Sequence, residues 1–221
     1  MQTHLIDQKG GGDARLLDRI YQLRAEVFAA HLGWDVATLC RREIDDFDTP
    51  AAVYGAVSAE YGDELEGCFR LLPTTGPYML KDVFPQLLHG HPAPQDVRIM
   101  ESSRFAVRPS VLKGRGIAGL NEVTAHLLIL QIQYCLAHDI HTVVSVTDLR
   151  FERVLRSAGL GCDRYGPPLQ VGVTKAVAGF MHPSPANLAS VWAVYNDLRR
   201  RRSYAVPTLP QPAIAAMVAA E

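Results

Sequence analysis

The sequence lacks the cysteine and histidine patterns of secreted and metal-binding proteins. Its four cysteines, Cys40, Cys68, Cys135 and Cys162, lie far apart with no Cys-x-x-Cys pair, which disfavours a zinc site and a dense disulfide framework. The eight histidines show no metal-ligand spacing. We therefore expect reduced thiols and no metal.

Long apolar runs and excess charge are also missing. The first twenty residues, MQTHLIDQKGGGDARLLDRI, have no basic region followed by an apolar one, and no stretch approaches the roughly 20 apolar residues of a membrane span. The net charge of −1 gives no basic field for nucleic acid. These absences favour a cytoplasmic protein without a membrane span that does not bind nucleic acid.

Helical and strand patterns alternate along the chain. Its 221 residues are 48% hydrophobic, and this content is enough for one substantial core. The first helix spans 13–33, with Asp13 as its N-cap and Gly33 after its last turn. The remaining elements are an antiparallel hairpin (51–60 and 64–73), a loop with a short helix (74–88), strands at 98–107, 140–147 and 167–180, and helices at 121–139, 148–160 and 184–202.

This order predicts an α/β fold, with one mixed sheet covered on both faces as a three-layer α/β/α sandwich. We expect a single domain over residues 1–203. Residues 204–221, which contain several prolines, are expected to form a loosely attached, flexible C-terminal tail.

The strand RIMESSRFAV (98–107) carries two charges that a regular strand would point apart. Side chains alternate faces along a strand, so Glu101 and Arg104 belong to opposite sides. Either one charge lies on a solvated face, or a bulge adds a residue and turns both toward one cleft.

Two groups of polar and aromatic residues stand out. The first contains Arg24, Phe28, Trp34, Asp45 and Asp48. Locally, Arg24 could form a surface ion pair and the aspartates could form turns. The same residue types can also hold a cationic, zwitterionic ligand, because aromatic rings attract cations and the charges pair with amine and carboxylate groups.

The second group joins Arg70 to Glu101, Ser102, Ser103 and Arg104. An arginine within a largely apolar strand is costly to bury unless it is paired. We therefore expect these charges to share a pocket in which each has a partner.

Six segments, LRAEVF, GW, EIDDFDTP, RLLPTTGPYML, ESSRFAV and RYGPPLQVG, occur in this order between about Leu16 and Gly172. In these segments the chain resembles the acyl-homoserine-lactone synthases, the autoinducer synthase family of bacterial quorum sensing. The resemblance implies an N-acetyltransferase (GNAT-like) fold, with a cleft where two parallel strands splay apart and a bulge in the strand beside it.

The resemblance implies that an acyl thioester is attacked by the amine of S-adenosyl-L-methionine, whose carboxylate then displaces methylthioadenosine to close the lactone. S-adenosylmethionine is a substrate in this reaction, and no cofactor is expected. The family's site positions correspond to Arg24, Phe28, Trp34, Asp45, Asp48, Arg70, Glu101 and Arg104.

Of these residues, Glu101 is the candidate base for the amine, directly or through water. Backbone N–H groups at the splayed strands would stabilise the oxyanion. The aspartates and arginines, Arg104 among them, would fix the substrate, and Phe28 and Trp34 would close over it.

An acyl pocket is predicted along the strands. Ser103, Ser145 and Thr147 are its candidate lining residues, where a hydroxyl could bond a 3-oxo group. A core serine satisfied by backbone is an equally good interpretation of this pattern.

The carrier of the acyl group has two candidate contacts. The glycine-rich turn KGRGIAG, with Lys113 and Arg115, suits a phosphopantetheine arm or is an ordinary turn and cap. Arg150, Arg153 and Arg156 recur at one-turn spacing, as a docking face for an acidic acyl carrier protein or as a solvated face.

Three interpretations therefore follow. The preferred one is a synthase that takes its acyl group from an acyl carrier protein, and the second is the same chemistry with acyl-coenzyme A. The third, from another class, is a non-catalytic module that binds a nucleotide or acyl ligand. A conventional acetyltransferase is disfavoured by the complete N-terminal group of site residues.

Overall fold

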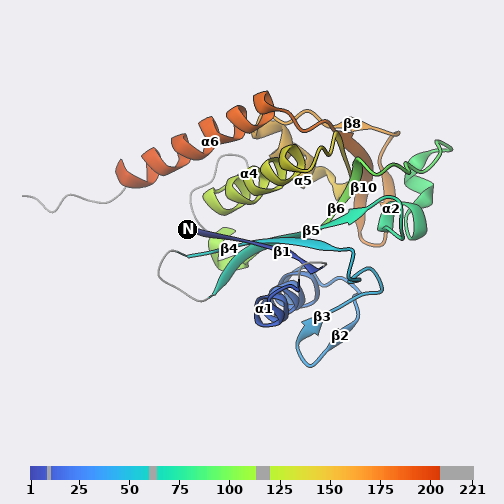
Figure 1. The fold of residues 1–221 in the computed structure, drawn as a ribbon, viewed down its shortest axis with the longest axis horizontal. Helices are drawn as coiled ribbons and strands as arrows, with labels where there is room; N and C mark the ends of the chain where they lie inside the picture. The colour runs from blue at the N-terminus through green and yellow to red at the C-terminus, as the bar shows by residue number, and fades with distance from the viewer. Residues whose placement is uncertain (9–10, 60–63, 113–119, 205–221) are drawn as a thin grey trace, which may run out of the picture.

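The fold has three layers, as the order of the elements predicts. In the computed structural model, which describes residues 1–8, 11–59, 64–112 and 120–204, a central sheet separates two groups of helices (Figure 1). Helix α1 (Ala14–Arg24) lies on one side, while α4 (Glu122–Ala137), α5 (Leu149–Ser157) and α6 (Pro185–Tyr204) lie on the other. The predicted three-layer α/β/α sandwich with a mixed sheet is confirmed.

The described part of the chain forms a sheet in the order β1-β4-β5-β6-β7-β10-β8, with β9 paired to β10. Only β6 and β7 run parallel, and the other neighbouring pairs are antiparallel. The strands are β1 (Gln2–Asp7), β4 (Val53–Ser58), β5 (Leu65–Pro73), β6 (Ile99–Val107), β7 (Thr142–Asp148), β8 (Asp163–Arg164), β9 (Leu169–Val171) and β10 (Thr174–Met181). A separate hairpin consists of β2 (Thr38–Leu39) and β3 (Arg42–Glu43).

The predicted first helix changes its winding halfway. Asp13 caps α1 as expected, since its carboxylate accepts the N–H groups of Arg15 and Leu16. After Arg24 the chain continues as the π-helix η2 (Ala25–His31), and the Leu32 N–H bonds the Val27 carbonyl five residues back. π-Helical turns occur mostly at functional sites, and η2 carries Phe28, one of the predicted site residues.

The helices of the other layer begin at side-chain caps. Asn121 caps α4, Asp148 caps α5 and Ser184 accepts the Asn187 N–H at the start of α6. Helix α4 is buried on nearly all sides because it lies between the sheet and α6. Its apolar sequence therefore has almost no helical periodicity.

Several strands differ from the sequence-based expectation. Strands β1, β2, β3 and β8 were not predicted, and the single strand expected over 167–180 is wrong. That segment folds into β9 and β10, joined by a two-residue turn in which Gly172 has a φ of 54°. The valines on both sides of Gly172 conceal the turn in the sequence. The short helix expected within 74–88 becomes α2 (Met79–Asp82) and the 3-10 helix η3 (Pro85–Leu88).

A bulge in β6 explains how Glu101 and Arg104 can face the same side of the sheet. Cys68 pairs with Ala106 and Arg70 pairs with Ser103, so β6 contains one more residue than β5 between these points. Arg104 takes up the extra residue with a φ of 52°. Its side chain therefore turns to the face of Glu101, and the predicted bulge is confirmed.

The parallel strands separate beside this bulge. Pairing between β6 and β7 runs from Ile99 with Thr142 to Ser102 with Ser145 and then stops, although both strands continue. The splayed pair expected from the resemblance is therefore present.

The boundary near residue 203 stays a prediction. Helix α6 continues to Tyr204, and residues 205–221 of the expected tail lie outside the described residues. In the ranges that the structure describes, every helix is too short or too polar to cross a membrane.

Close packing of the sheet gives a first prediction. An added Cβ at Gly55 on β4 would overlap the buried ring of Phe69, whereas Gly161 has open space around it. We expect Gly55→Ala to lower the free energy of unfolding by about 1–3 kcal/mol. Urea denaturation measures this loss, with Gly161→Ala as the control. Equal stability of the two variants would contradict the packing.

Candidate active site

Six charged side chains meet at one face of the sheet, and we call them the arginine–carboxylate cluster. Its cations come from the end of α1, from β5 and from the β6 bulge, and its anions come from β3 and the loop after it. The members are Arg24, Arg70, Arg104, Glu43, Asp45 and Asp48. Three positive charges balance three negative ones, so the cluster is neutral when all six groups are ionised.

Arg24 is fully buried and joins two of the anions. Its Nε donates to Glu43 at 2.5 Å, and its two terminal nitrogens donate to the oxygens of Asp48 at 2.7 and 2.9 Å. The surface ion pair that the local sequence pattern allowed is therefore wrong for Arg24. Its guanidinium ties α1 to the loop that follows β3.

Arg70, also fully buried, holds the other side of that loop. It donates to both oxygens of Asp45, at 2.5 and 3.1 Å, and to Asp48 at 2.7 Å. Its Nε donates to the Ser103 hydroxyl, which lies directly across the β5–β6 pair. The expectation that this strand arginine is paired is confirmed, but its charged partners are Asp45 and Asp48 from the first group of residues.

Arg104 lies at the more open side of the cluster. It contacts Glu43 at 2.9 Å and Asp45 at 2.6 Å, and its guanidinium carbon is 5.6 Å from the centre of the Phe28 ring. The side chains of Arg104 and Asp45 are 11% and 16% exposed, whereas Arg24 and Arg70 are fully covered. A ligand would reach the cluster from this side.

Asp48 connects the two buried arginines. Its Oδ1 accepts from Arg24, Arg70 and the Tyr54 hydroxyl, each at 2.7 Å. Burial alone would raise the pKa of Asp48, but the hydrogen bonds and charge of Arg24 and the charge of Arg70 hold it well below its usual range. Burial and the neighbouring Asp48 carboxylate raise the pKa of Tyr54, which therefore remains a neutral donor.

Glu101 is buried on the same face, and backbone groups hold its carboxylate. The N–H groups of Met79 and Leu80, at the start of α2, donate to its oxygens at 2.9 and 2.6 Å. Burial raises its pKa to about 7, although these hydrogen bonds and the charges of Arg70 and Arg104 act against the rise. A carboxyl group with such a pKa can accept a proton near neutral pH.

Phe28 and Trp34 stack beside Arg104. Their ring centres are 5.2 Å apart with 12° between the planes, and Trp34 is 38% exposed. Together with Arg104 the rings form an aromatic wall at the open side of the cluster. The structure thus brings all eight predicted site residues to one region, and their individual roles remain predictions.

The candidate acyl-pocket residues have different surroundings. Ser145 donates to the carbonyl of Ser102 at 2.8 Å, where the β6–β7 pairing ends. Ser103 accepts the Arg70 hydrogen bond, and Thr147 lies on β7 opposite Val177 of β10. All three hydroxyl-bearing residues are partly buried, and their part in an acyl pocket stays a prediction.

The candidate carrier contacts are only partly described. Lys113 and Arg115 lie outside the described residues. Arg150, Arg153 and Arg156 lie exposed on α5, where Arg153 donates to the Leu149 carbonyl and Arg156 lies 3.5 Å from Glu152. Their exposure is compatible with docking and with a solvated face.

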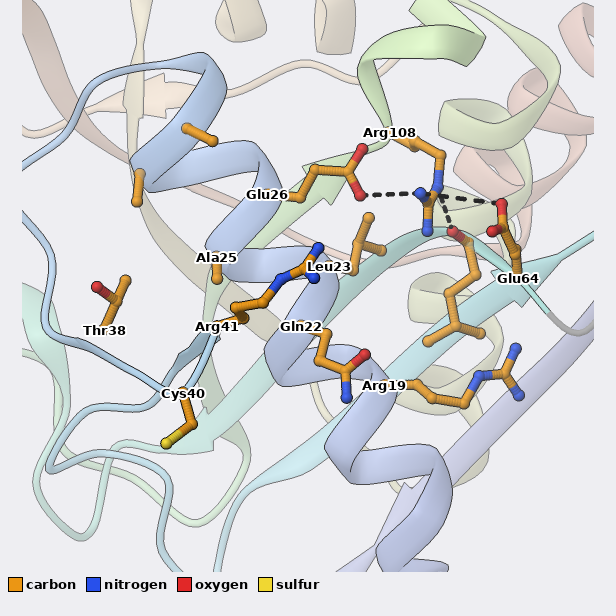
Figure 2. A pocket seen from close by; sticks show the side chains of 13 residues that line it. Arg19, Gln22, Leu23, Ala25, Glu26, Thr38, Cys40, Arg41, Glu64 and Arg108 are labelled. Atoms are coloured by element: carbon orange, nitrogen blue, oxygen red, sulfur yellow. Dashed lines mark hydrogen bonds and ion pairs between the residues drawn. The ribbon is translucent and has the colours of Figure 1, made fainter.

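A separate groove of about 820 Å³ lies between α1, η2 and the β2–β3 hairpin (Figure 2). Arg19, Arg41 and the Arg108–Glu26 ion pair line it. None of the six cluster residues contributes to its walls. This groove is therefore distinct from the candidate active site.

Three residues at the site were missed from the sequence. Glu43 opens the EIDDFDTP segment and pairs with two arginines, Tyr54 bonds Asp48, and Met79 contacts Arg70 and Arg104 through its sulfur. Glu43 could have been suspected from its place beside the aspartates. Nothing local distinguishes Tyr54 or Met79 from core residues.

The mixed sheet, with its splayed parallel pair β6 and β7, defines a protein with an N-acetyltransferase-like fold. A putative N-acetyltransferase from Lactobacillus plantarum shares this fold at 14% identity, with a TM-score of 0.56 over 83% of this chain and 98% of that one. Residues 12–191 match the family described as autoinducer synthase. The chain belongs to this family, and it is an acyltransferase of the acyl-homoserine-lactone synthase class.

Individual relatives agree with this assignment. An acyl-homoserine-lactone synthase from Pseudomonas aeruginosa is 40% identical over 167 residues, which cover 75% of this chain and 82% of that protein. The structure of the AHL synthase LasI has a TM-score of 0.74 at 34% identity and covers 87% of this chain and 94% of its own.

Two further solved structures are similar to this chain. TofI, in a ternary complex with an inhibitor and MTA, has a TM-score of 0.74 at 28% identity and covers 86% of this chain and 96% of its own. BjaI, described as CoA-dependent, shares the fold at 23% identity, with a TM-score of 0.79 over 88% of this chain and 89% of its own.

The pairing within the cluster predicts a large effect of removing Glu43. Its side chain is 1% exposed, and Glu43→Ala would leave Arg24 and Arg104 buried with one partner fewer each. We expect a loss of about 3–5 kcal/mol in the free energy of unfolding, measured by urea denaturation.

The matched control is Glu64→Ala. Glu64 is 82% exposed and lies 3.9 Å from Arg108, so its removal should leave the urea midpoint unchanged. Similar losses for the two variants would show that the cluster does not hold the fold together.

Proposed function

We propose that this enzyme makes an N-acyl-L-homoserine lactone from S-adenosyl-L-methionine and an acyl thioester, releasing methylthioadenosine and the free carrier thiol. The observation that carries the proposal is the placement of Glu101 beside the arginine–carboxylate cluster and the aromatic wall. A base, paired charges and aromatic rings match the amine, carboxylate and sulfonium of this substrate.

Several observations support S-adenosylmethionine as the substrate. TofI, a relative at 28% identity, is described in complex with MTA, the product that this substrate would leave. In the present chain, Arg104 and Asp45 are the partly exposed members of the cluster and can pair with a carboxylate and an ammonium group. The stacked rings of Phe28 and Trp34 provide a face for the sulfonium.

In the first step, the substrate amine loses a proton to Glu101, directly or through a water molecule, and attacks the thioester carbonyl. The new C–N bond forms as the C–S bond of the thioester breaks, and the carrier leaves as a thiol after taking up a proton. Backbone N–H groups where β6 and β7 separate would stabilise the oxyanion.

In the second step, a carboxylate oxygen attacks the γ-carbon and displaces neutral methylthioadenosine. The negative carboxylate and the positive sulfonium cancel in this step, so no further proton is needed. Arg104, with Arg70 behind it, would orient the carboxylate for the attack.

For the acyl donor we propose an acyl carrier protein. The three exposed arginines of α5 provide a positive surface for an acidic partner, and Lys113 and Arg115 are the proposed contacts of the phosphopantetheine arm. The fold alone does not distinguish the donors, because BjaI, described as CoA-dependent, shares it. Acyl-coenzyme A therefore remains the alternative donor.

A non-catalytic module with this fold is the alternative from another class. Such a module has no need for a buried carboxyl group with a raised pKa beside Arg70 and Arg104. We therefore favour the enzyme, and turnover of S-adenosylmethionine distinguishes the two.

The role of Glu101 predicts a pH dependence. Because the base must be ionised and burial raises its pKa to about 7, kcat/KM should rise between about pH 6 and 8. Glu101→Gln should lower kcat by about 10²- to 10⁴-fold and abolish this rise. Methylthioadenosine release measures the rate, and an unchanged pH profile in Glu101→Gln would contradict the role.

The donor proposal predicts a selective effect of charge reversal on α5. Arg150→Glu combined with Arg153→Glu should lower kcat/KM for acyl-carrier-protein substrates about tenfold at low salt, with little effect on acyl-coenzyme A. Free thiol released from each donor measures this. Equal effects on both donors, or better use of acyl-coenzyme A by the wild type, would overturn the carrier-protein assignment.

A further inference from the structure

Two guanidinium N–H groups, one from the covered Arg70 and one from the partly exposed Arg104, donate to the same sulfur atom. Arg104 Nη1 donates to Met79 Sδ at 3.3 Å, and Arg70 Nη2 donates to the same sulfur at 3.4 Å. Within the described residues, the other hydrogen bonds of the three cluster arginines go to carboxylates or to the Ser103 hydroxyl.

A thioether is a poor partner for two cations. Its sulfur is only a weak acceptor, whereas a charge-assisted bond to a carboxylate oxygen is roughly twice as strong as a neutral one. The protein thus places its weakest acceptor where two positive charges converge. A carboxylate in that position would satisfy both N–H groups better.

The Met79 side chain can also move away from the two arginines. It is partly exposed and has three rotatable bonds, whereas the neighbouring Leu80 is fully buried and anchors α2. The backbone N–H of Met79 donates to Glu101 and does not depend on where its side chain lies. The side chain can therefore move without releasing the proposed base.

We propose that the Met79 thioether is a placeholder for the substrate's α-carboxylate. It occupies the two donors of Arg70 and Arg104 in the free enzyme and gives them up when the carboxylate binds. This inference rests on the proposed function, which supplies an amino-acid substrate.

A placeholder stabilises only the free enzyme. Met79→Leu keeps the size of the side chain but removes the acceptor, so the free enzyme loses two weak hydrogen bonds that the complex does not contain. We expect Met79→Leu to bind S-adenosylmethionine about threefold more tightly. Affinity for methylthioadenosine, which has no carboxylate, should stay unchanged.

Met79→Gln should change the affinity for S-adenosylmethionine in the opposite direction. Its amide oxygen is a stronger neutral acceptor for the same two donors, so S-adenosylmethionine should bind more weakly while methylthioadenosine is again unaffected. The control is Met181→Leu, a partly buried methionine on β10, which should change neither affinity.

Isothermal titration calorimetry of the full chain with each ligand decides the matter. Opposite shifts of the two Met79 variants, confined to S-adenosylmethionine, support the placeholder. Weaker or unchanged binding by Met79→Leu, or equal shifts for both ligands, would overturn it and leave the proposed function standing. Failure of the wild type to bind S-adenosylmethionine would instead defeat the proposed function, and the placeholder with it.

Discussion

The shared carboxylate of Asp48 is the interaction on which the site depends. One oxygen accepts hydrogen bonds from Arg24, Arg70 and Tyr54, and so joins α1, β5 and β4 to the loop after β3. Because the loop is fixed from several sides, Asp45 and Glu43 are held where they can pair with Arg104. The position of Arg104 at the open side of the cluster follows from these contacts and from the bulge in β6.

Such a network is expensive to bury. Taking ions from water costs several kcal/mol each, and only close pairing with good geometry offsets that cost. An apolar core would hold these elements together without the free-energy cost of burying ions, so stability alone does not account for the cluster. The proposed zwitterionic substrate would account for it, since paired charges can exchange partners with such a substrate without reorganising water.

The sequence allowed most of the architecture to be predicted, and the structure brings the eight predicted site residues to one region. Because side chains alternate faces along RIMESSRFAV, a regular strand would point Glu101 and Arg104 to opposite sides. The bulge at Arg104 brings both side chains to one face. Strands β1 and β8 were missed because they form only by pairing with β4 and β10. The β9–β10 turn was missed because valines flank Gly172, and the π-helix and the β2–β3 hairpin were missed as well. Met79 was missed because its place between two arginines is set by α2 and the sheet together.

In the proposed reaction, one site both forms the amide and closes the lactone. Mass spectrometry of wild-type enzyme with S-adenosylmethionine and an acyl-carrier-protein or acyl-coenzyme A thioester tests this most directly, by counting both products in each reaction. We expect one N-acyl-homoserine lactone for each methylthioadenosine released, with no open-chain acyl product accumulating. Methylthioadenosine without lactone, or an acylated substrate that is never cyclised, would contradict it.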